Sequence, residues 1–398
     1  MKILVANIGS TSFKFRLFEM AGANERELAA GGADRIGQDA GTLSWQVVGQ
    51  SLRSRPSDFA DHGQAVTRVL EQLVADDALA TPGDLDAVAF KAVMGGDLDP
   101  VVRVDEHVLE RMEYFVPIAP MHNPAYIAAM RMFRQVLGET PLVAAFEPGF
   151  HHTIPLRRQR YAVPPEWAER YGIRRYGYHG ASHCYIATRT AELMGADKAR
   201  RIISCHLGGS SSVCAIRDGR SVANSFGLSA QSGLPHGARA GEFDPFALSL
   251  LNRQGGLSLD QMLTILGTQS GLAAVSGTSG DMRDIHEAAA DGSERAKLAI
   301  DVLVTAIRDY LGAYLVELGG ADAIVFTGGI GQKDPYVRAA VCDGLEFCSI
   351  ELDERKNEPA AGECRIEGAK SSSAVWVMPT NEELIVARQA AELLAKGS

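Results

Sequence analysis

Residues 7–15 read NIGSTSFKF and gather an amide, a glycine, three hydroxyl groups and a lysine in one short stretch. The apolar run KILVA (residues 2–6) precedes it, and apolar and polar residues alternate from Phe13 to Phe18, as expected for two strands joined by a turn. Hydrogen-bond donors at the tip of such a hairpin suit the binding of phosphate oxygens. An ordinary glycine–serine turn has the same composition, so this stretch alone leaves both interpretations open.

Two further glycine-rich turns follow apolar strands. HLGGSSSV (206–213) and FTGGIG (326–331) can each present backbone N–H groups to oxyanions. Three such turns in one chain favour a nucleoside triphosphate, which has enough oxygens to engage all of them. The chain contains neither a GxxxxGK[ST] loop nor a Rossmann GxGxxG with its downstream acid, so the predicted phosphate site is of another kind.

Isolated charged residues are the next candidates for chemistry. Arg239 lies within GARAG (237–241), where small neighbours leave room for an anion to approach the guanidinium. His179 could contact a phosphate, or it could cap a helix or fill the core together with His183. Glu382 could bind a metal, or it could simply complement the dipole at the start of a helix.

The elements that must position these residues alternate between strands and helices, which predicts an α/β protein. RIISCHLGGSSSVCAIRDGRSV (201–222) repeats the plan of the N-terminal hairpin and adds an Asp218-Gly219 turn. This echo, roughly two hundred residues after the first copy, predicts a duplicated domain plan. A third apolar strand within 321–332 runs directly into glycines.

Helices are expected at three places. Apolar residues recur at steps of three and four over 294–319, and Gly319-Gly320 is expected to end that helix. Ser182 is expected to cap a second helix, and Thr380 is expected to open a third with a capping box. Residues 34–66 are polar and irregular, which predicts a surface excursion.

Length and composition bound the class of protein. The 398 residues suggest two domains, and 46% hydrophobic with 22% charged residues is typical of a soluble globular protein. The net charge of −10, without a basic block, argues against a nucleic acid or an anionic membrane as partner. The six cysteines lack metal-ligand spacing and are expected to be reduced thiols. Together with the absence of a signal peptide and of a long apolar run, this predicts a cytoplasmic protein.

The motifs of this chain resemble those of the acetate kinase family from residue 3 to residue 388. The corresponding motifs, in order and at matching spacing, are NIGSTSFKF, RYGYHGASH (175–183), HLGGSSSVCAI (206–216), GARAGEFDP (237–245), SGTSGDMRD (276–284), FTGGIG (326–331) and PTNEEL (379–384). The resemblance implies two similar α/β domains of the actin-like ATPase (ribonuclease H-like) fold, with the nucleotide in the cleft between them. It places an acceptor- and phosphate-side domain at 1–149 plus 382–398, and a nucleotide-binding and dimerisation domain at 150–381.

Carried over position by position, the resemblance implies a role for each matching residue. The implied catalytic residues are Glu147, His179 and Arg239. The implied ligands of Mg²⁺, for which Mn²⁺ may substitute, are Asn7 and Glu382. The implied substrate-binding residues are Lys91, Val93, Met121, Tyr178 and Ala230. The implied ATP/ADP- and phosphate-binding residues are Ser10, Ser12, Lys14, His206, Gly208, Gly209, Asp281, Arg283, Gly328, Gly329 and Gly331.

Departures from the family pattern gather at the acceptor end. Lys91 replaces an arginine that holds the substrate carboxylate, which exchanges a bidentate fork for a point charge, and Met94 replaces a histidine. Glu147 replaces the catalytic aspartate and is one methylene longer. Smaller departures are Gly209 for asparagine, Ser210 for glycine, Met121 for leucine, Tyr178 for phenylalanine, Ala230 for proline, and GQKD (331–334) for GENS. These departures leave two interpretations open: an acceptor larger or more polar than acetate, or ordinary drift with acetate retained as the acceptor.

The resemblance implies transfer of a phosphoryl group from ATP to acetate, giving acetyl phosphate and ADP by direct in-line displacement. An ionised carboxylate needs no general base, so Glu147 would orient the metal or its water. Open alternatives are a propionate- or butyrate-type acid, a hydroxy-acid alcohol for which Glu147 would be the base, and a non-catalytic ATP-binding regulator. Pyrophosphate is a weaker candidate donor. The expected partners are a small carboxylate, ATP and a second copy of the chain in a homodimer.

Overall fold

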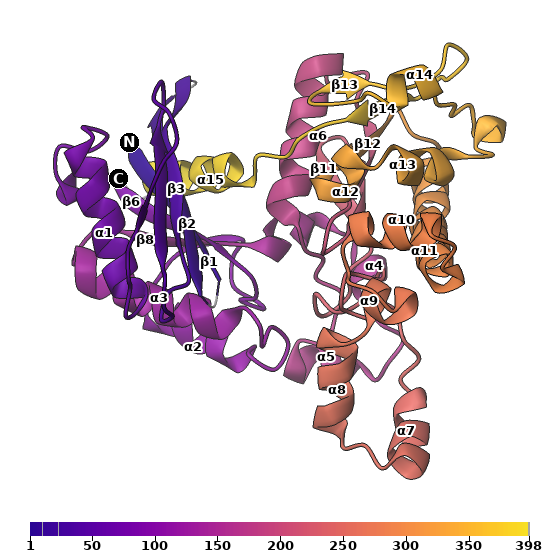
Figure 1. Cartoon of the computed structure of the whole chain (residues 1–398), viewed down its shortest axis with the longest axis horizontal. Coiled ribbons are helices and arrows are strands. Elements are labelled where there is room, and N and C mark those ends of the chain that lie inside the picture. Colours follow the sequence, from indigo (N-terminus) through magenta and orange to yellow (C-terminus); the bar gives the residue numbers. More distant parts are fainter. Residues whose placement is uncertain (10, 23, 397–398) are drawn as a thin grey trace. The chain divides into compact units, whose positions relative to one another are not determined.

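The computed structural model describes residues 1–9, 11–22 and 24–396, and the chain divides into two compact units (Figure 1). Unit 1 comprises Met1–Gly149 and Asn381–Ser398, and unit 2 comprises Phe150–Thr380. Each unit is built around its own mixed β-sheet, with helices packed against it.

The sheet of unit 1 has the strand order β5-β4-β3-β2-β1-β6-β8-β7. β1 pairs antiparallel with β2 and parallel with β6, and β6 pairs parallel with β8. The strands are β1 (Lys2–Ile8), β2 (Ser12–Ala21), β3 (Asn24–Asp34), β4 (Thr42–Val47), β5 (Arg53–Pro56), β6 (Ala87–Ala92), β7 (Val101–Arg103) and β8 (Leu142–Phe146).

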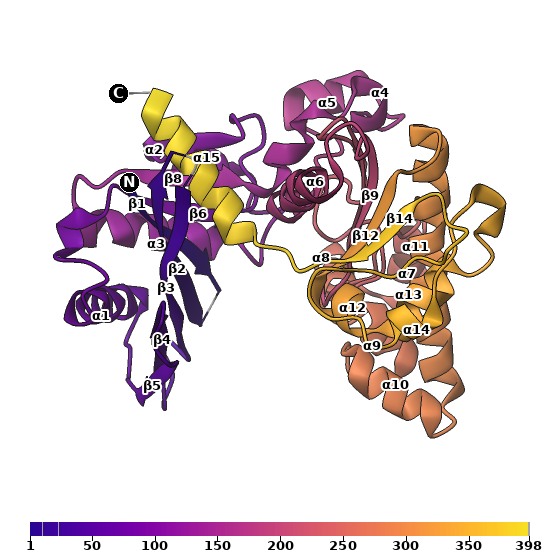
Figure 2. The same ribbon diagram turned by 90° about the horizontal axis from the view of Figure 1, so that it is seen from above.

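Helices cover both faces of this sheet. α15 (Glu382–Lys396), at the far end of the chain, packs on β1, β6 and β2, across the sheet from α1 (His62–Ala75) and α3 (Asn123–Leu137) (Figure 2). α2 (Glu106–Tyr114) packs against α3. The 3₁₀ segment η1 (Pro82–Asp84) precedes β6, and a second 3₁₀ segment, η2 (Glu147–Thr153), runs from unit 1 into unit 2. Because both faces are covered, β1 and β6 are apolar along nearly their whole length.

The sheet of unit 2 has the order β11-β10-β9-β12-β14-β13. β9 pairs antiparallel with β10 and parallel with β12, and β12 pairs parallel with β14. The strands are β9 (Arg201–His206), β10 (Ser212–Arg217), β11 (Arg220–Asn224), β12 (Ala323–Thr327), β13 (Cys364–Arg365) and β14 (Ala374–Val377). Asp218 and Gly219 both have positive φ in the β10–β11 turn, which confirms the predicted hairpin turn.

Alternate residues of β9 face two separate cores. Ile203 and Cys205 pack against α11 (Glu294–Leu318), while Ile202 packs with Ile186 and Ala187 of α6 (Gly180–Met194). The other helical elements of unit 2 are α4 (Leu156–Gln159), α5 (Pro165–Tyr171), α7 (Ala247–Gly255), α8 (Leu259–Thr268), α9 (Gly271–Ser276), α10 (Met282–Ala290), α12 (Gly328–Lys333), α13 (Pro335–Cys342), η3 (Glu346–Cys348) and α14 (Glu354–Asn357).

The two sheets share one plan. The order β3-β2-β1-β6-β8 in unit 1 is repeated as β11-β10-β9-β12-β14 in unit 2. In each copy, an antiparallel hairpin with a third antiparallel strand is followed by two strands that run parallel to its first strand. The predicted α/β class and the duplicated domain plan are therefore confirmed.

The prediction for residues 34–66 was wrong in part, because β4 and β5 extend the sheet of unit 1 here and α1 begins at His62. Leu43 and Trp45 are the buried positions of β4, and Thr42, Ser44 and Gln46 between and beside them are polar. Arg53 and Arg55 lie over the Trp45 ring. Two buried apolar positions give too weak an alternation to reveal a strand in the sequence alone.

Two predicted helix starts also required correction. α6 begins at Gly180, so Ser182 lies inside the helix, where it is buried against His206, and does not cap it. Asn381, rather than Thr380, caps α15, with its Oδ1 accepting from the Leu384 N–H at 3.2 Å. α11 is confirmed and ends at Gly319 in the left-handed conformation. In the described part of the chain, no helix is both long and apolar enough to cross a membrane.

Candidate active site

The carboxyl ends of the central strands carry the polar residues of unit 1. Asn7 pairs with Lys14 across the β1–β2 hairpin, so their side chains lie on one face. Lys91 lies near the end of β6, and Glu147 directly follows the neighbouring strand β8. Glu382 opens α15, the helix that packs on β1 and β6. The fold thus brings residues from opposite ends of the chain to one edge of the sheet.

Lys91 joins two carboxylates into a cluster that we call the Lys91 cluster: Lys91, Glu147 and Glu382. Its Nζ lies 2.6 Å from Glu382 Oε2 and 3.4 Å from Glu147 Oε1. Burial by itself would lower the pKa of Lys91, but the two carboxylates raise that pKa well above its ordinary value. The ammonium group therefore stays charged and compensates two negative charges that are largely shielded from water.

Tyr126 of α3 is a site residue that sequence reasoning missed. Its hydroxyl donates to Asn7 Oδ1 at 3.2 Å and accepts from the Ile8 N–H at 3.4 Å. Burial raises the pKa of Tyr126 to about 12, so the phenol keeps its proton at neutral pH. This contact holds the amide of Asn7 in one orientation. The sequence contains no motif that marks this tyrosine, because helical periodicity indicates only a buried position.

The other residues predicted from unit 1 are more dispersed. Val93 is buried just beyond β6, whereas the Met121 side chain is 62% exposed and has no apolar enclosure within its own unit. Ser12 opens β2, and its carbonyl accepts from the Gly9 N–H at 2.8 Å, which closes the turn. Ser10 lies outside the described residues.

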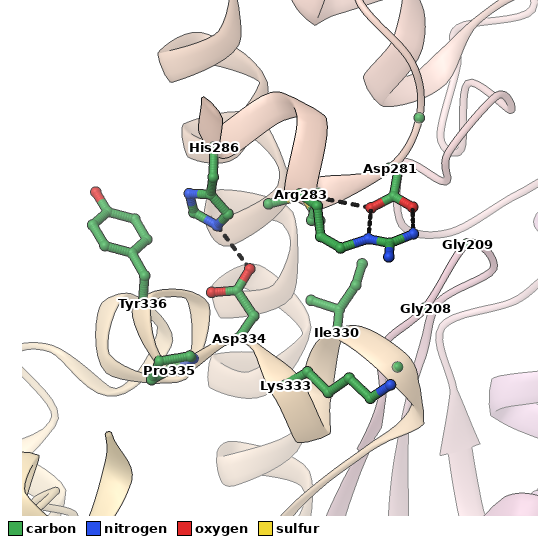
Figure 3. A pocket seen from close by; sticks show the side chains of 13 residues that line it. Gly208, Gly209, Asp281, Arg283, His286, Ile330, Lys333, Asp334, Pro335 and Tyr336 are labelled. Carbon is green, nitrogen blue, oxygen red and sulfur yellow. Dashed lines mark hydrogen bonds and ion pairs between the residues drawn. The ribbon is translucent and has the colours of Figure 1, made fainter. Parts of the chain in front are cut away.

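Unit 2 contains a cavity of about 660 Å³ where β9 and β12 end (Figure 3). Because these strands are parallel neighbours, the glycine turns that follow them meet at one edge of the sheet. A cavity of this size suits a nucleotide. Its lining residues are Gly208, Gly209, Gly280, Asp281, Met282, Arg283, His286, Gly329, Ile330, Lys333, Asp334, Pro335 and Tyr336.

Glycine is needed in this cavity for two different reasons. A Cβ added to Gly209 or Gly329 would meet no atom within 4 Å, so both positions face open space that a side chain would occupy. Gly328 has a φ of +76°, and a Cβ there would lie 2.5 Å from the carbonyl oxygen of Leu207. Gly328 therefore shapes the turn, and Gly331 is buried as well. Gly209 and Gly329 leave room for a ligand.

An ion pair and a histidine–carboxylate contact flank the cavity (Figure 3). Arg283 donates to both carboxylate oxygens of Asp281, at 3.0 and 2.6 Å, and these bonds lower the pKa of Asp281 to about 2. His286 Nε2 lies 2.8 Å from Asp334 Oδ2. Sequence reasoning missed the His286–Asp334 pair, although Asp334 lies three residues after the last glycine of the turn that it did identify.

His179 and His206 were predicted separately and lie together. His179 precedes α6 with a φ of +58°, a left-handed conformation that is uncommon for a residue other than glycine. Its ring centroid is 4.2 Å from that of His206, and its Nδ1 lies 2.9 Å from Ser212 Oγ. His206 Nδ1 in turn lies 2.8 Å from Ser182 Oγ.

Arg239 is partly buried and donates to the carbonyl of Ala230 at 2.5 Å, which joins two of the predicted site residues. Burial lowers the pKa of Arg239 to about 10, and the group stays charged at neutral pH. Among the described residues, no carboxylate forms an ion pair with it. An uncompensated guanidinium beside small residues favours the binding of an anion.

Tyr178, one of the predicted substrate-binding residues, has its hydroxyl engaged inside unit 2. The side chain is buried, and the hydroxyl donates to the carbonyl of Leu228 at 2.7 Å. The single phenolic proton is thereby used within unit 2. The Tyr178 ring also packs edge-on against Phe226, which in turn contacts the His179 ring.

A duplicated sheet with glycine turns at its strand ends, a nucleotide-sized cavity and an uncompensated arginine defines an α/β kinase of the actin-like ATPase class. The model of the acetokinase family matches residues 2–388. The chain belongs to the acetokinase family. It is accordingly an enzyme, an ATP-using phosphotransferase with a carboxyl group as acceptor.

Full-length relatives agree with this assignment. Acetate kinases of Clostridium botulinum (strain 657 / Type Ba4) and Dictyoglomus thermophilum are each 39% identical to this chain, with all of both sequences covered. The solved structure of Porphyromonas gingivalis acetate kinase aligns with a TM-score of 0.88 at 34% identity, covering 99% of each chain. A propionate kinase from Francisella tularensis aligns with a TM-score of 0.89 at 31% identity, covering 98% of each chain.

Proposed function

We propose that this enzyme transfers the γ-phosphoryl group of ATP to acetate by direct in-line displacement and releases acetyl phosphate and ADP. The observation that carries the proposal is the cavity of unit 2, where the glycine turns after β9 and β12 leave open space beside backbone N–H groups. The nucleotide would occupy this cavity, with its base near the Asp281–Arg283 and His286–Asp334 pairs and its phosphates at the glycine turns.

The charges of the site suit transfer between two anions. A carboxylate with a pKa of roughly 4 is ionised at neutral pH and attacks phosphorus without a general base. The main barrier is then repulsion between acceptor and phosphate. Arg239 would neutralise equatorial phosphoryl oxygens, His179 would donate a hydrogen bond to them, and Lys91 would attract the acceptor carboxylate.

Residues of unit 1 fit the magnesium ion that such kinases use. Asn7 Oδ1 and the carboxylates of Glu147 and Glu382 are oxygen donors of the kind that Mg²⁺ prefers, and Lys91 contacts both carboxylates. Asn7 and Glu382 would hold the ion, and Glu147 would orient it or its water. When bound, the ion would neutralise charge on the phosphate oxygens. Mn²⁺ has the same preference for oxygen and could replace it.

The acceptor is the least constrained part of the proposal. A propionate kinase aligns with this chain as well as an acetate kinase does. Ala230 is small, and Met121 is exposed within its unit, so neither residue by itself limits the acceptor to one methyl group. A short acid larger than acetate is therefore the second candidate, ahead of a hydroxy-acid alcohol.

The test is an acceptor panel with ATP and Mg²⁺, scored by ADP release and by trapping acyl phosphate as a hydroxamate. We expect hydroxamate with acetate or propionate, and no activity after chelation of the metal. ADP release without hydroxamate would indicate an alcohol acceptor and would refute a carboxylate kinase. The absence of both signals would refute transfer altogether.

We also propose that the enzyme is a homodimer whose contact includes the α7–α8 hairpin. Phe246 is 83% exposed there, and Leu250, Leu259 and Leu263 are also exposed. Such a cluster is costly to leave in water and suits a second copy of the chain. Light scattering is expected to give twice the chain mass, and Phe246→Glu is expected to lower it. A monomeric wild-type protein would refute the proposal.

A further inference from the structure

His179 is held in a conformation that its own chemistry does not favour. The left-handed region is unfavourable for a residue with a Cβ, and such strain persists only where the surroundings enforce it. Two sets of hydrogen bonds around His179, one on its ring and one on the preceding peptide, enforce the orientation of this residue.

A chain of hydrogen bonds runs from the His179 ring into the core. Ser212 Oγ lies 2.9 Å from His179 Nδ1 and 2.8 Å from His183 Nε2. His183 Nδ1 then lies 2.9 Å from Ser204 Oγ. Ser204, Ser212 and His183 are fully buried, so no solvent competes for these bonds.

The hydroxyl of Ser212 has one proton and two imidazole neighbours, so it must donate to one ring and accept from the other. Burial, together with His151 and His206, lowers the pKa of His183 well below its ordinary value, so His183 is neutral and has a single N–H. The hydrogen bonds from His179 to Ser204 can therefore all donate in one sense or all in the opposite sense. The two senses differ in which nitrogen of His179 carries the proton.

The role proposed above for His179 favours one direction. Nδ1 of its ring faces Ser212 Oγ at 2.9 Å. If the role proposed above for His179 is right, a neutral ring can donate to a phosphoryl oxygen only from Nε2. Ser212 must then donate to Nδ1 and accept from His183 Nε2–H, and Ser204 must donate to His183 Nδ1.

We propose that Ser212 and His183 are positioning residues that fix His179 as the Nε2–H tautomer and aim that N–H at the transferred phosphoryl group. This inference rests on the proposed function, in which His179 contacts the phosphoryl oxygens. It adds two residues of this chain to the machinery and assigns each of them a defined donor or acceptor role.

The backbone before His179 is held as firmly as the ring. The carbonyl of Tyr178 accepts from His151 Nε2 at 2.9 Å and from Asn224 Nδ2 at 3.3 Å. Because a carbonyl only accepts, His151 carries its proton on Nε2, and Ser221 donates to His151 Nδ1 at 2.8 Å. This fixes the peptide between Tyr178 and His179, and with it the direction in which the ring leaves the backbone.

The tautomer can be read directly in the ligand-free protein by two-bond ¹H–¹⁵N correlation spectra of a ¹⁵N-histidine sample, with His179→Gln identifying the His179 signals. We expect a protonated Nε2 and a bare Nδ1 at pH 7 in the wild type. Ser212→Ala should give a mixture of both tautomers. A wild-type ring protonated on Nδ1, or a spectrum unchanged by Ser212→Ala, would overturn the proposal, and neither reading depends on catalysis.

Kinetics provide the second readout. Ser212→Ala should lower kcat about 10- to 100-fold and change both KM values by less than about threefold, because a misaimed donor weakens the transition state rather than substrate binding. His183→Gln keeps an N–H near the position of Nε2 and should retain more activity than His183→Phe. Ser225→Ala serves as the matched control. It removes a buried hydroxyl that accepts from the Val213 N–H at 3.0 Å and takes no part in the hydrogen bonds from His179 to Ser204.

The outcomes distinguish failure of the positioning role of Ser212 from failure of the proposed kinase function. A loss of kcat in Ser225→Ala equal to that in Ser212→Ala would reduce Ser212 to a packing residue and overturn the positioning role. A wild-type enzyme that forms no hydroxamate would refute the proposed function, while the tautomer spectra would still decide the hydrogen-bond direction. If Ser212→Ala fails to fold, the wild-type spectrum and the His183 pair of variants decide the question.

Discussion

Lys91 Nζ lies 2.6 Å from Glu382 Oε2, so a residue near the end of β6 is ion-paired with the first residue of a helix almost three hundred positions later. The same ammonium lies 3.4 Å from Glu147. One positive charge therefore balances two carboxylates in a largely buried place. The group that the sequence assigns to substrate binding is also a structural counter-ion.

Lys91→Met should destabilise the protein because it removes the positive charge that lies between two largely buried carboxylates. We expect the free energy of unfolding of unit 1 at pH 7 to fall by about 3 kcal/mol, measured by urea titration. The loss should shrink as the pH falls, since protonation removes the carboxylate charges. Lys198→Met, at an exposed lysine, should change stability by less than about 0.5 kcal/mol. Equal effects of the two variants would contradict this assignment.

Arg239→Lys should impair catalysis more than nucleotide binding. A lysine keeps the charge but loses the fork that can contact two phosphoryl oxygens, so kcat should fall about 100-fold while KM for ATP changes little. Hydroxamate initial rates measure the effect. Arg295→Lys, at an exposed arginine that donates to the carbonyls of Ala274 and Val275, is the matched control. A normal kcat in Arg239→Lys would exclude the proposed role.

Gly329→Val should block nucleotide binding without unfolding unit 2. No atom lies within 4 Å of a Cβ at this position, so the added side chain should enter the cavity rather than clash with the fold. We expect the Kd for ADP to rise at least about tenfold by calorimetry with a near-normal unfolding temperature. Gly312→Ala also meets open space, but it lies on α11 away from the cavity lining and should leave the Kd unchanged. Unaltered ADP binding in Gly329→Val would place the nucleotide elsewhere.

His151 should make unit 2 labile in mild acid. Burial lowers the pKa of His151 to about 4, below its unfolded value of roughly 6.5. Between these values the unfolded state binds more protons, so stability rises with pH there by at most about 1.4 kcal/mol per pH unit from this group. Its contribution is complete above pH 6.5 and is lost as the pH falls toward 4.

The variant His151→Gln tests this dependence. Glutamine keeps an N–H for the Tyr178 carbonyl but does not titrate, so the slope of unfolding free energy against pH between 6.5 and 4 should decrease, even if stability at pH 7 also falls. Urea unfolding at several pH values measures the slope. His152→Gln, at the exposed neighbouring histidine, should leave it unchanged.

Periodicity and turn chemistry predicted much of the fold. The apolar steps of α11, the Asp218-Gly219 turn and the repeated strand–turn–strand pattern follow from local rules and are present as expected. The failures arose where the signal was weak or shared. β4 has two buried apolar positions, and both Thr380 and Asn381 are residue types that cap helices. Whether residues 42–47 form a strand, and which of Thr380 and Asn381 caps the helix, depends on where these segments lie against the sheet of unit 1.

By itself, the sequence determined that glycine- or hydroxyl-rich turns follow three apolar strands, that Arg239 lacks bulky neighbours, and that the motifs occur in the order of one enzyme family. Only the tertiary structure decided that Lys91 neutralises Glu147 and Glu382, that Tyr126 holds Asn7, and that Ser212 links His179 to His183. The reason is physical: backbone preferences are local and can be read along the chain. A buried charge or hydroxyl is defined by whichever distant side chains the packed sheet and helices bring within about 3 Å of it.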